Sequence, residues 1–454
     1  MTATKKTAVI LIHGIGEQRP MDTMWSFMDA AWVQDDAMVE EYDRAIYSKP
    51  GDTAENHELR RVTTRGDRHS GRRFDFHEYY WAHMMPDNRL SDVLGWLASL
   101  FVRLPGTLPS GYLGHWILAW TLTFVAAGCY VAFLLDSDRL GWASGLATLL
   151  LPIVTSLVLN AIVPVVGDAA RYLRAAPRNV EARQRIRAEG MKLLARLHRT
   201  GDYDRIVVLG HSLGSLVAYD VLTHAWAGLD ERKLEGRHAE GSDAMRLLAD
   251  VENAGAALFE DEKADDGSLV AKKGAHDERS RFREAQRAYR RELASGEGAP
   301  WLVSDLITLG SPLGKADILL AGSPSAFETR KKRREFPICP PFYEYWAKDV
   351  KRFSFPRDAK SRIPHHAAPF AATVWSNVHF ETRLLLLGDP VAGPVAPHFG
   401  PGVVDHALSS AGLRFRHLDY WRMPSGKATP AVRALRTALD LRDVGDVETR
   451  EHEG

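Results

Sequence analysis

The sequence predicts an α/β protein with a mostly parallel sheet and helices on both faces of that sheet. Short apolar runs rich in Val, Ile and Leu recur along the chain, and each is bordered by Gly, Pro or polar turn residues. A long segment of helical spacing precedes one of these runs, and helix followed by strand is the pattern of crossover connections. A length of 454 residues fits one such domain that carries large insertions.

The predicted strands are the short apolar runs 7–12, 74–81, 205–209, 302–309, 372–378 and 413–417. The run 74–81 is assigned on its aromatic residues, which suit a pleated surface. A helix is predicted over 171–199, which is rich in Ala, Leu and Arg and ends before Gly201 and Asp202.

The composition excludes several classes of partner and cofactor. The 58 basic residues balance the 58 acidic ones, so there is no net charge to attract nucleic acid. Cys129 and Cys339 are the only cysteines, which leaves no disulfide framework and no thiolate metal site. The pair His365 and His366 has no carboxylate at ligand spacing. We therefore expect no metal and no cofactor.

Two apolar segments interrupt the α/β pattern and predict a membrane hairpin. About 21 residues from 115 to 135 and about 27 from 140 to 166 lack Asp, Glu, Lys and Arg, and about 20 such residues suffice to cross a bilayer. The loop 136–139 between them is short enough to return the chain to the side it left. A pair of buried helices in a soluble core, or a dimer interface, is the alternative. The shorter run 93–104 has the length of a segment that lies along the interface.

The distribution of arginines predicts the orientation of this hairpin. The second apolar segment is followed by Arg171, Arg174, Arg178, Arg183, Arg185 and Arg187. Arg103 precedes the first segment, whereas the loop between them has only Arg139 beside two aspartates. Basic residues favour the cytoplasmic side, so we expect a protein of the cytoplasmic membrane whose remaining parts face the cytoplasm. The run 7–12 is too short for a signal peptide.

A second insertion, 230–298, is dense in charged residues and poor in aromatics. It predicts solvated helices with disordered joints, or a mobile lid. The basic run 331–334 is a solvated loop or a contact for anionic headgroups.

The strongest chemical signal is the sequence from Gly210 through His211, Ser212 and Leu213 to Gly214. It follows the predicted strand 205–209 and precedes 215–222, whose apolar spacing suits a helix. This is the G-x-S-x-G nucleophile elbow in its expected context, where glycines permit close backbone approach and the turn exposes the serine hydroxyl. Ser212 is therefore the candidate nucleophile.

A serine hydroxyl needs a general base, and the base needs an orienting acid. In the strand–elbow–helix arrangement both lie downstream of the serine. His417, after the last predicted strand, is the candidate base. Asp389 is the candidate acid because it lies in a turn fixed by Pro390 after the strand 372–378. Three rival acids are Asp305, Glu381 and Asp405.

An oxyanion formed on the substrate needs two N–H donors. The amide of Leu213 is one candidate. The other is predicted in the loop His13, Gly14, Ile15 and Gly16 after the first strand, with Ile15 as the donor.

These residues resemble those of bacterial α/β-hydrolases of the lipase and esterase kind. The sequence 13–18 is similar to their oxyanion loop and 210–215 to their nucleophile elbow. Weaker similarities are found at 309–313, at 375–377 with 389–391, and at His417 with Tyr420 and Trp421. The resemblance spans residue 7 to about 421, without the apolar hairpin and the charged insertion. It implies the α/β-hydrolase fold and its Ser, Asp and His triad, although residues 384–387 make the loop before Asp389 longer than usual.

The predicted function is that of a membrane-anchored serine hydrolase that cleaves a carboxylic ester, with a lipid-like or other apolar acyl substrate. An acyltransferase with the same triad and a catalytically silent membrane scaffold are the alternatives. The predicted organisation is core 1–90, membrane insertion 91–170, nucleophile region 171–229, charged insertion or lid 230–300, C-terminal core 301–425, and helix with tail 426–454.

Overall fold

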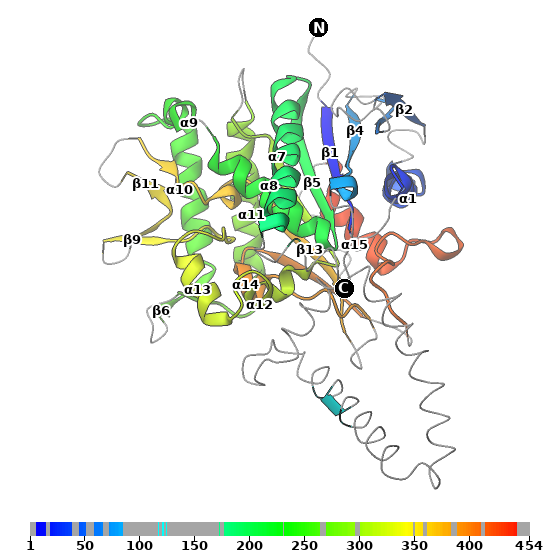
Figure 1. Ribbon diagram of the computed structural model, residues 1–454. Helices are drawn as coiled ribbons and strands as arrows, with labels where there is room; N and C mark the ends of the chain where they lie inside the picture. The colour runs from blue at the N-terminus through cyan, green and yellow to red at the C-terminus, as the bar shows by residue number, and fades with distance from the viewer. Residues whose placement is uncertain are drawn as a thin grey trace.

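The computed structural model is built around an eight-stranded sheet in the order β14-β13-β8-β5-β1-β4-β3-β2 (Figure 1). The residues that the structure describes are 6–14, 19–38, 45–50, 59–66, 72–84, 117, 120, 121, 124, 172, 177–229, 231–263, 269–295, 300–347, 350–356, 361–382, 388–409 and 414–442. The strands are β1 (Lys6–Ile12), β2 (Ile46–Pro50), β3 (Arg60–Thr64), β4 (Arg73–Tyr79), β5 (Tyr203–His211), β8 (Val303–Leu309), β13 (Val374–Phe380) and β14 (Val404–Leu408). Neighbours from β14 to β4 pair in parallel, and β3 and β2 add an antiparallel edge. The predicted α/β class with a mostly parallel sheet is confirmed.

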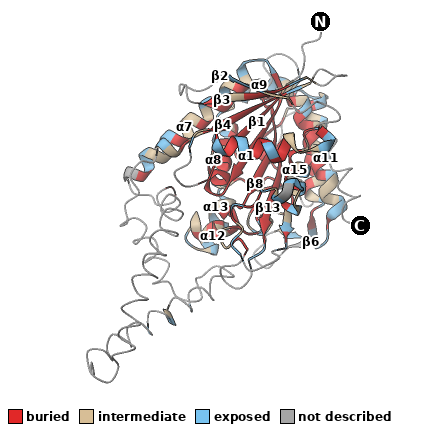
Figure 2. Cartoon of the chain, turned by 90° about the vertical axis from the view of Figure 1, so that its right-hand side faces the viewer, coloured by how far each residue is buried: buried red, intermediate tan, exposed pale blue. Residues whose placement is uncertain are grey.

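Helices cover both faces of the sheet (Figures 1 and 2). On one face lie α7 (Pro177–Arg199), α8 (Leu213–Ala227), α10 (Asp243–Ala256) and α11 (His276–Leu293). On the other lie α1 (Asp22–Met28), which continues as the π-helical turn η1 (Asp29–Val33), and α15 (Pro430–Leu439). Shorter helices are α9 (Glu231–Arg237), α12 (Ala316–Leu319), α13 (Pro324–Lys332) and α14 (Ala396–Phe399). The 3-10 turns are η2 (Ala82–Met84), η5 (Pro312–Lys315), η6 (Pro369–Ala371) and η7 (Pro424–Gly426).

Three small hairpins lie outside the main sheet. They pair β6 (Phe259–Lys263) with β7 (Leu269–Ala271), β9 (Glu344–Ala347) with β10 (Val350–Arg352), and β11 (Ser354–Phe355) with β12 (Ile363–Pro364).

The central strands are buried on both sides, as their apolar runs predict. In β1, Ala8 and Ile10 pack in the cluster beneath α7 and α8, and the alternate residues Val9 and Leu11 pack in the cluster beneath α1 and α15. Successive side chains of a strand point to opposite faces, so a continuous apolar run serves two helical layers.

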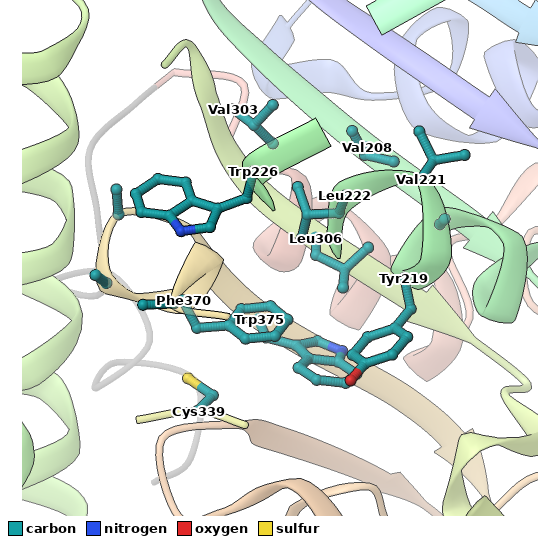
Figure 3. Packing of buried hydrophobic residues seen from close by; sticks show 14 of the residues in the cluster. Val208, Tyr219, Val221, Leu222, Trp226, Val303, Leu306, Cys339, Phe370 and Trp375 are labelled. Carbon is teal, nitrogen blue, oxygen red and sulfur yellow. The ribbon is translucent and has the colours of Figure 1, made fainter. Parts of the chain in front are cut away.

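Aromatic side chains fix α8 against the sheet (Figure 3). The ring of Trp375 on β13 stacks on Phe370 at 4.7 Å between centroids and lies 5.5 Å from Tyr219 of α8. Further along α8, Trp226 meets Trp301 edge-on at 5.0 Å. Large buried rings of this kind dominate core packing, so the helix that follows Ser212 is held firmly.

Within the charged stretch predicted as a solvated insertion or lid, helices α10 and α11 each bury one face in the core. Helix α11 buries Phe282 and Tyr289 against the sheet layer. Its polar side chains bond to carbonyl oxygens of the core: Arg283 to Trp375, Gln286 to Phe370 and Thr373, and Arg290 to Asp204. Arginine and glutamine stems can pack against apolar surface while their ends bond to carbonyls. The density of charged residues in a segment therefore does not show whether its helix is solvated or packs on the sheet.

Several other predicted elements differ from those of the structure. The run 413–417 is not a strand where it is described, because only Phe415 forms a bridge, to Gly388. Strand β14 and the edge strands β2 and β3 were not predicted. The helix predicted over 171–199 is described as α7 from Pro177 onward.

The predicted membrane hairpin and the run 93–104 lie outside the described residues, apart from Ile117, Trp120, Thr121 and Phe124. Within the part of the chain that is described, no helix is both long enough and apolar enough to cross a bilayer.

Candidate active site

Ser212 lies in a strained turn between β5 and α8. Its backbone has φ 54° and ψ −129°, an unfavourable combination for a residue with a Cβ. The turn is held by its neighbours, since Ser212 N donates to Leu309 O at 2.8 Å and Ser215 N donates to Ser212 O at 3.0 Å. Strain of this kind is the mark of a nucleophile elbow.

The two glycines of the elbow leave no room for side chains. A Cβ on Gly210 would lie 2.5 Å from the carbonyl oxygen of Gly214, and one on Gly214 would lie 2.3 Å from the carbonyl oxygens of Ile12 and His13. All these neighbours are backbone atoms that cannot move aside. The start of α8 therefore packs directly on the end of β1, as the sequence pattern requires.

The structure brings Ser212, His417 and Asp389 together. His417 Nε2 lies 2.8 Å from Ser212 Oγ, and His417 Nδ1 lies 2.9 Å from both carboxylate oxygens of Asp389. All three residues are buried. The three groups form a continuous hydrogen-bonded chain from carboxylate through imidazole to hydroxyl.

Asp389 is held in place by neighbours that favour its ionised form. Tyr420 Oη donates to Oδ2 at 2.6 Å, and the amides of Val391 and Ala392 donate to Oδ1 at 3.1 Å each. Burial alone raises the pKa of Asp389, but the bond to His417, the charge of His417 and the Tyr420 and Ala392 bonds outweigh it and lower the pKa below its usual value. Asp389 is therefore a carboxylate at neutral pH.

His211 positions the segment that carries the histidine. Burial, reinforced by the charge of His417, lowers the pKa of His211 to about 3, so its ring is neutral. Its Nε2 lies 2.9 Å from the carbonyl oxygen of His417, which requires the ring proton on Nε2. The ring also lies 4.8 Å from that of Trp421. The residue before Ser212 thus fixes the backbone of His417.

The predicted oxyanion donors are described only in part. Leu213 is the first residue of α8, and an N–H in the first turn of a helix has no carbonyl partner in that helix. A Cβ on Gly14 would lie 2.8 Å from Ser212 Cβ, so the chain leaving β1 passes directly beside the serine. Ile15 and Gly16, with 17 and 18, lie outside the described residues.

His13 anchors the described part of this loop. Trp81 Nε1 donates to His13 O at 3.0 Å, and Trp81 N donates to His13 Nε2 at 3.2 Å. Burial lowers the pKa of His13 to about 4, which keeps the ring neutral and able to accept. His13 thus ties the start of the loop to the chain that follows β4.

The rival acids occupy other places. Asp305 forms a buried ion pair with Arg205 at 2.7 Å. Asp405 accepts from the side chain of Asn377 at 2.7 Å and from the backbone of Val395 and Ala396 at 2.9 Å each. Glu381 follows β13, with its amide bonded to Leu408 O at 2.9 Å. Among the described residues, Asp389 is the carboxylate bonded to His417.

The described part of the chain contains no group of three His, Cys, Asp or Glu side chains that could hold a metal ion. His365 bonds to the backbone instead, since its Nδ1 accepts from Ala367 N at 3.1 Å. We therefore assign no metal-binding role to His365.

Sequence reasoning missed the supporting groups. The roles of His211 and of Tyr420 Oη were not predicted, nor was the contact of Ser215 Oγ with Ser311 Oγ at 2.6 Å. Tyr420 and Ser311 lie in segments that the resemblance to α/β-hydrolases includes, since Tyr420 follows His417 closely and Ser311 follows β8. Nothing in their spacing reveals which atoms they bond.

Comparisons of the chain with protein-family models, with curated proteins and with solved structures find no match. The chemistry of the site is therefore argued from its geometry. A hydroxyl, an imidazole and a carboxylate bonded in sequence can generate a nucleophile at neutral pH.

Proposed function

We propose that the chain is a serine hydrolase of the α/β-hydrolase type that cleaves a carboxylic ester through an acyl-enzyme on Ser212. The observation that carries the proposal is the bonded series of Asp389, His417 and Ser212 at the carboxyl ends of parallel strands. Open α/β sheets bind their ligands at that edge. The strained elbow at Ser212 supports the same reading.

In the first half of the reaction, Ser212 Oγ attacks the ester carbonyl carbon while His417 Nε2 takes the hydroxyl proton. Asp389 holds the ring with its proton on Nδ1 and stabilises the imidazolium. Collapse of the tetrahedral intermediate breaks the bond to the alcohol, which leaves with the proton from His417. The acyl group then remains on Ser212.

In the second half, His417 removes a proton from water, and the resulting hydroxide attacks the acyl carbon. The acid product leaves and Ser212 regains its proton. The negative charge on the carbonyl oxygen is stabilised in both halves by the amide of Leu213 and by that of Ile15.

The proposal includes the membrane hairpin at 115–135 and 140–166, with the site facing the cytoplasm. Its support is the length and apolar character of the two segments and the arginines that flank them. A bilayer concentrates apolar esters near the site, which favours a lipid-like substrate. A cysteine placed in 136–139 should react with an impermeant thiol reagent from outside intact cells, and one at Arg178 should not; the reverse pattern contradicts this topology.

The decisive experiment is labelling of the purified protein with a fluorophosphonate probe. The wild type should be labelled and the folded Ser212→Ala variant should not. The absence of labelling in a folded wild-type sample would contradict the proposal and favour a silent scaffold. Water and alcohol acceptors offered together with an ester series then separate hydrolysis from acyl transfer and define the preferred chain length.

A further inference from the structure

A cavity of about 200 Å³ lies beside α8, apart from the Ser212 site. Leu216 and Asp220 form its α8 wall, about one and two turns beyond the nucleophile. The rest of the lining comes from α7, from α12, from the chain around α13 and from one residue before α7: Tyr172, Arg183, Arg187, Leu319, Leu320, Arg330 and Phe336. The mechanism above uses none of these residues.

The lining contains three guanidinium groups and one carboxylate. Arg187 neutralises that carboxylate, because its Nε and Nη2 bond to Asp220 Oδ2 at 2.9 and 2.6 Å. Tyr172 Oη donates to the same oxygen at 2.7 Å. The cavity wall therefore keeps an excess of positive charge.

Arg183 carries that excess. Its Nη1 donates to Tyr172 O at 3.0 Å, and a carbonyl oxygen carries no full charge to balance a guanidinium. Burial and the charge of nearby Arg187 lower the pKa of Arg183. An anion in the cavity would relieve both effects.

Arg330 completes the set from helix α13. Its guanidinium lies over the ring of Phe336 at 4.3 Å, and its Nη1 donates to Leu320 O at 2.8 Å. Its Nε forms an ion pair with Glu335 at 2.6 Å, outside the lining, so the unbalanced charge of the cavity is that of Arg183. Stacking and these bonds fix the planar group at the cavity wall before any ligand arrives.

We propose that this cavity binds a phosphate group, carried either by a phospholipid headgroup or by a soluble phosphate ester. Guanidinium groups match phosphate oxygens in geometry and charge, and a phosphate can accept from several of them at once. The volume is below that of drug-sized sites but exceeds a single water, which suits a phosphate with a few attached atoms. Leu216, Leu319 and Leu320 offer apolar contact for those atoms.

The lipid source draws on the hairpin proposed above. Tyr172 follows Val166, the end of the second apolar segment, by six residues. Six residues reach at most about 20 Å, so the cavity would lie close to the membrane surface. The last turn of α13, which supplies Arg330 to the cavity wall, also carries Lys331 and Lys332.

The test is calorimetric titration of the full chain, purified in zwitterionic micelles, with inorganic phosphate and with glycerol 3-phosphate. Wild type should bind saturably, and Arg183→Gln should bind at least about tenfold more weakly, as loss of a bond to a charged group predicts. Arg185→Gln is the matched control, because Arg185 lies on α7 outside the cavity and pairs with Glu181. Arg330→Gln serves as the second variant if Arg183→Gln melts early.

Equal phosphate binding by wild type and both cavity variants, or no saturable binding, overturns the proposal. So does acetate binding as tight as phosphate binding. Short-chain phosphatidic acid added to the micelles identifies the source: if it displaces phosphate while phosphatidylcholine does not, the ligand is a lipid headgroup, and if neither does, it is a soluble ester. No turnover is measured, so failure here is distinct from failure of the hydrolase proposal.

Discussion

The two ends of β5 each bury a set of charged and polar groups, and the two sets differ in kind. Near the start of the strand, Arg205 bonds to Ser304 and Asp305 at 2.9 and 2.7 Å and to the carbonyl oxygens of Leu439 and Asp440 at 3.2 and 2.6 Å. Beyond its other end, Ser212 meets His417. Both sets are almost wholly shielded from water.

The first set is an ion pair, and the second is, in the proposed mechanism, the set that transfers a proton. Burial raises the pKa of Asp305, but the charges of Arg205 and Arg287 outweigh burial and lower this pKa below its ordinary value. The pair therefore stays ionised. The second set contains a neutral hydroxyl bonded to an imidazole, on a strained backbone. Burial and pairing alone therefore do not mark a site, whereas a transferable proton on a strained turn does.

The largest effect is expected for Asp389→Asn. The amide cannot hold His417 with its proton on Nδ1, so turnover should fall by about three to four orders of magnitude while the fold persists. Ester hydrolysis and the unfolding midpoint together test this. Glu381→Gln is the control and should remain nearly normal. If Glu381→Gln is inactive and Asp389→Asn active, the acid is misassigned.

A large loss of stability, and not of turnover, is expected when Arg205 at the start of β5 is replaced. Arg205→Met leaves Asp305 buried without its partner and should cost about 3–5 kcal/mol of stability. Urea unfolding measures the loss, and replacement of Asp305 by Leu in the same chain should recover most of it. Turnover per folded molecule should be unchanged; a thousandfold loss would mean that this end also takes part in the chemistry.

A smaller effect is expected on the pH dependence of stability. His211 stays neutral in the folded state down to about pH 3, whereas an unfolded histidine takes up its proton near its ordinary value of 6.5. Stability should therefore fall as the pH drops below about 6.5, by up to about 1.4 kcal/mol per pH unit from this residue. His211→Gln should flatten the curve of unfolding free energy against pH. An unchanged slope would show that His211 is protonated in the fold.

The smallest effect is expected for Tyr420→Phe, which removes one bond to Asp389. We expect about a tenfold loss of turnover, the size of one bond to a charged group. A carboxylate that accepts one bond fewer is more basic and stabilises the imidazolium more strongly, so the acidic limb of the profile of kcat/KM against pH should move to higher pH. Tyr47→Phe on the exposed strand β2 is the control. A lower rate with an unmoved limb would assign Tyr420 a packing role alone.

The parts of the fold that sequence predicts are those where one physical term dominates. Strands β1, β5 and β8 each contain a run of apolar residues long enough to recognise, because both of their faces are buried. β14 was missed because Asp405 and His406 interrupt its run. The edge strands β2 and β3 were missed because few of their residues are apolar and their backbone pairing leaves no trace in side-chain type.

The site likewise contains features that the local sequence predicts and features that it does not predict. Ser212 and its glycines were predictable because a tight turn dictates residue types locally. The pairing of His417 with Asp389 was predictable only as an order along the chain. The supporting bonds of His211 and Tyr420 depend on tertiary distances that no local pattern encodes.

In the proposed mechanism, the spacing of Ser212 and His417 along the chain also sets when the protein can become reactive during its synthesis. His417 follows Ser212 by 205 residues. At about 5–20 residues per second, roughly 10–40 s separate the translation of the two. For that interval the serine hydroxyl has no base and is no more nucleophilic than any other alcohol. Under the proposed mechanism, a nascent chain is thus inert toward esters until most of its sheet can assemble.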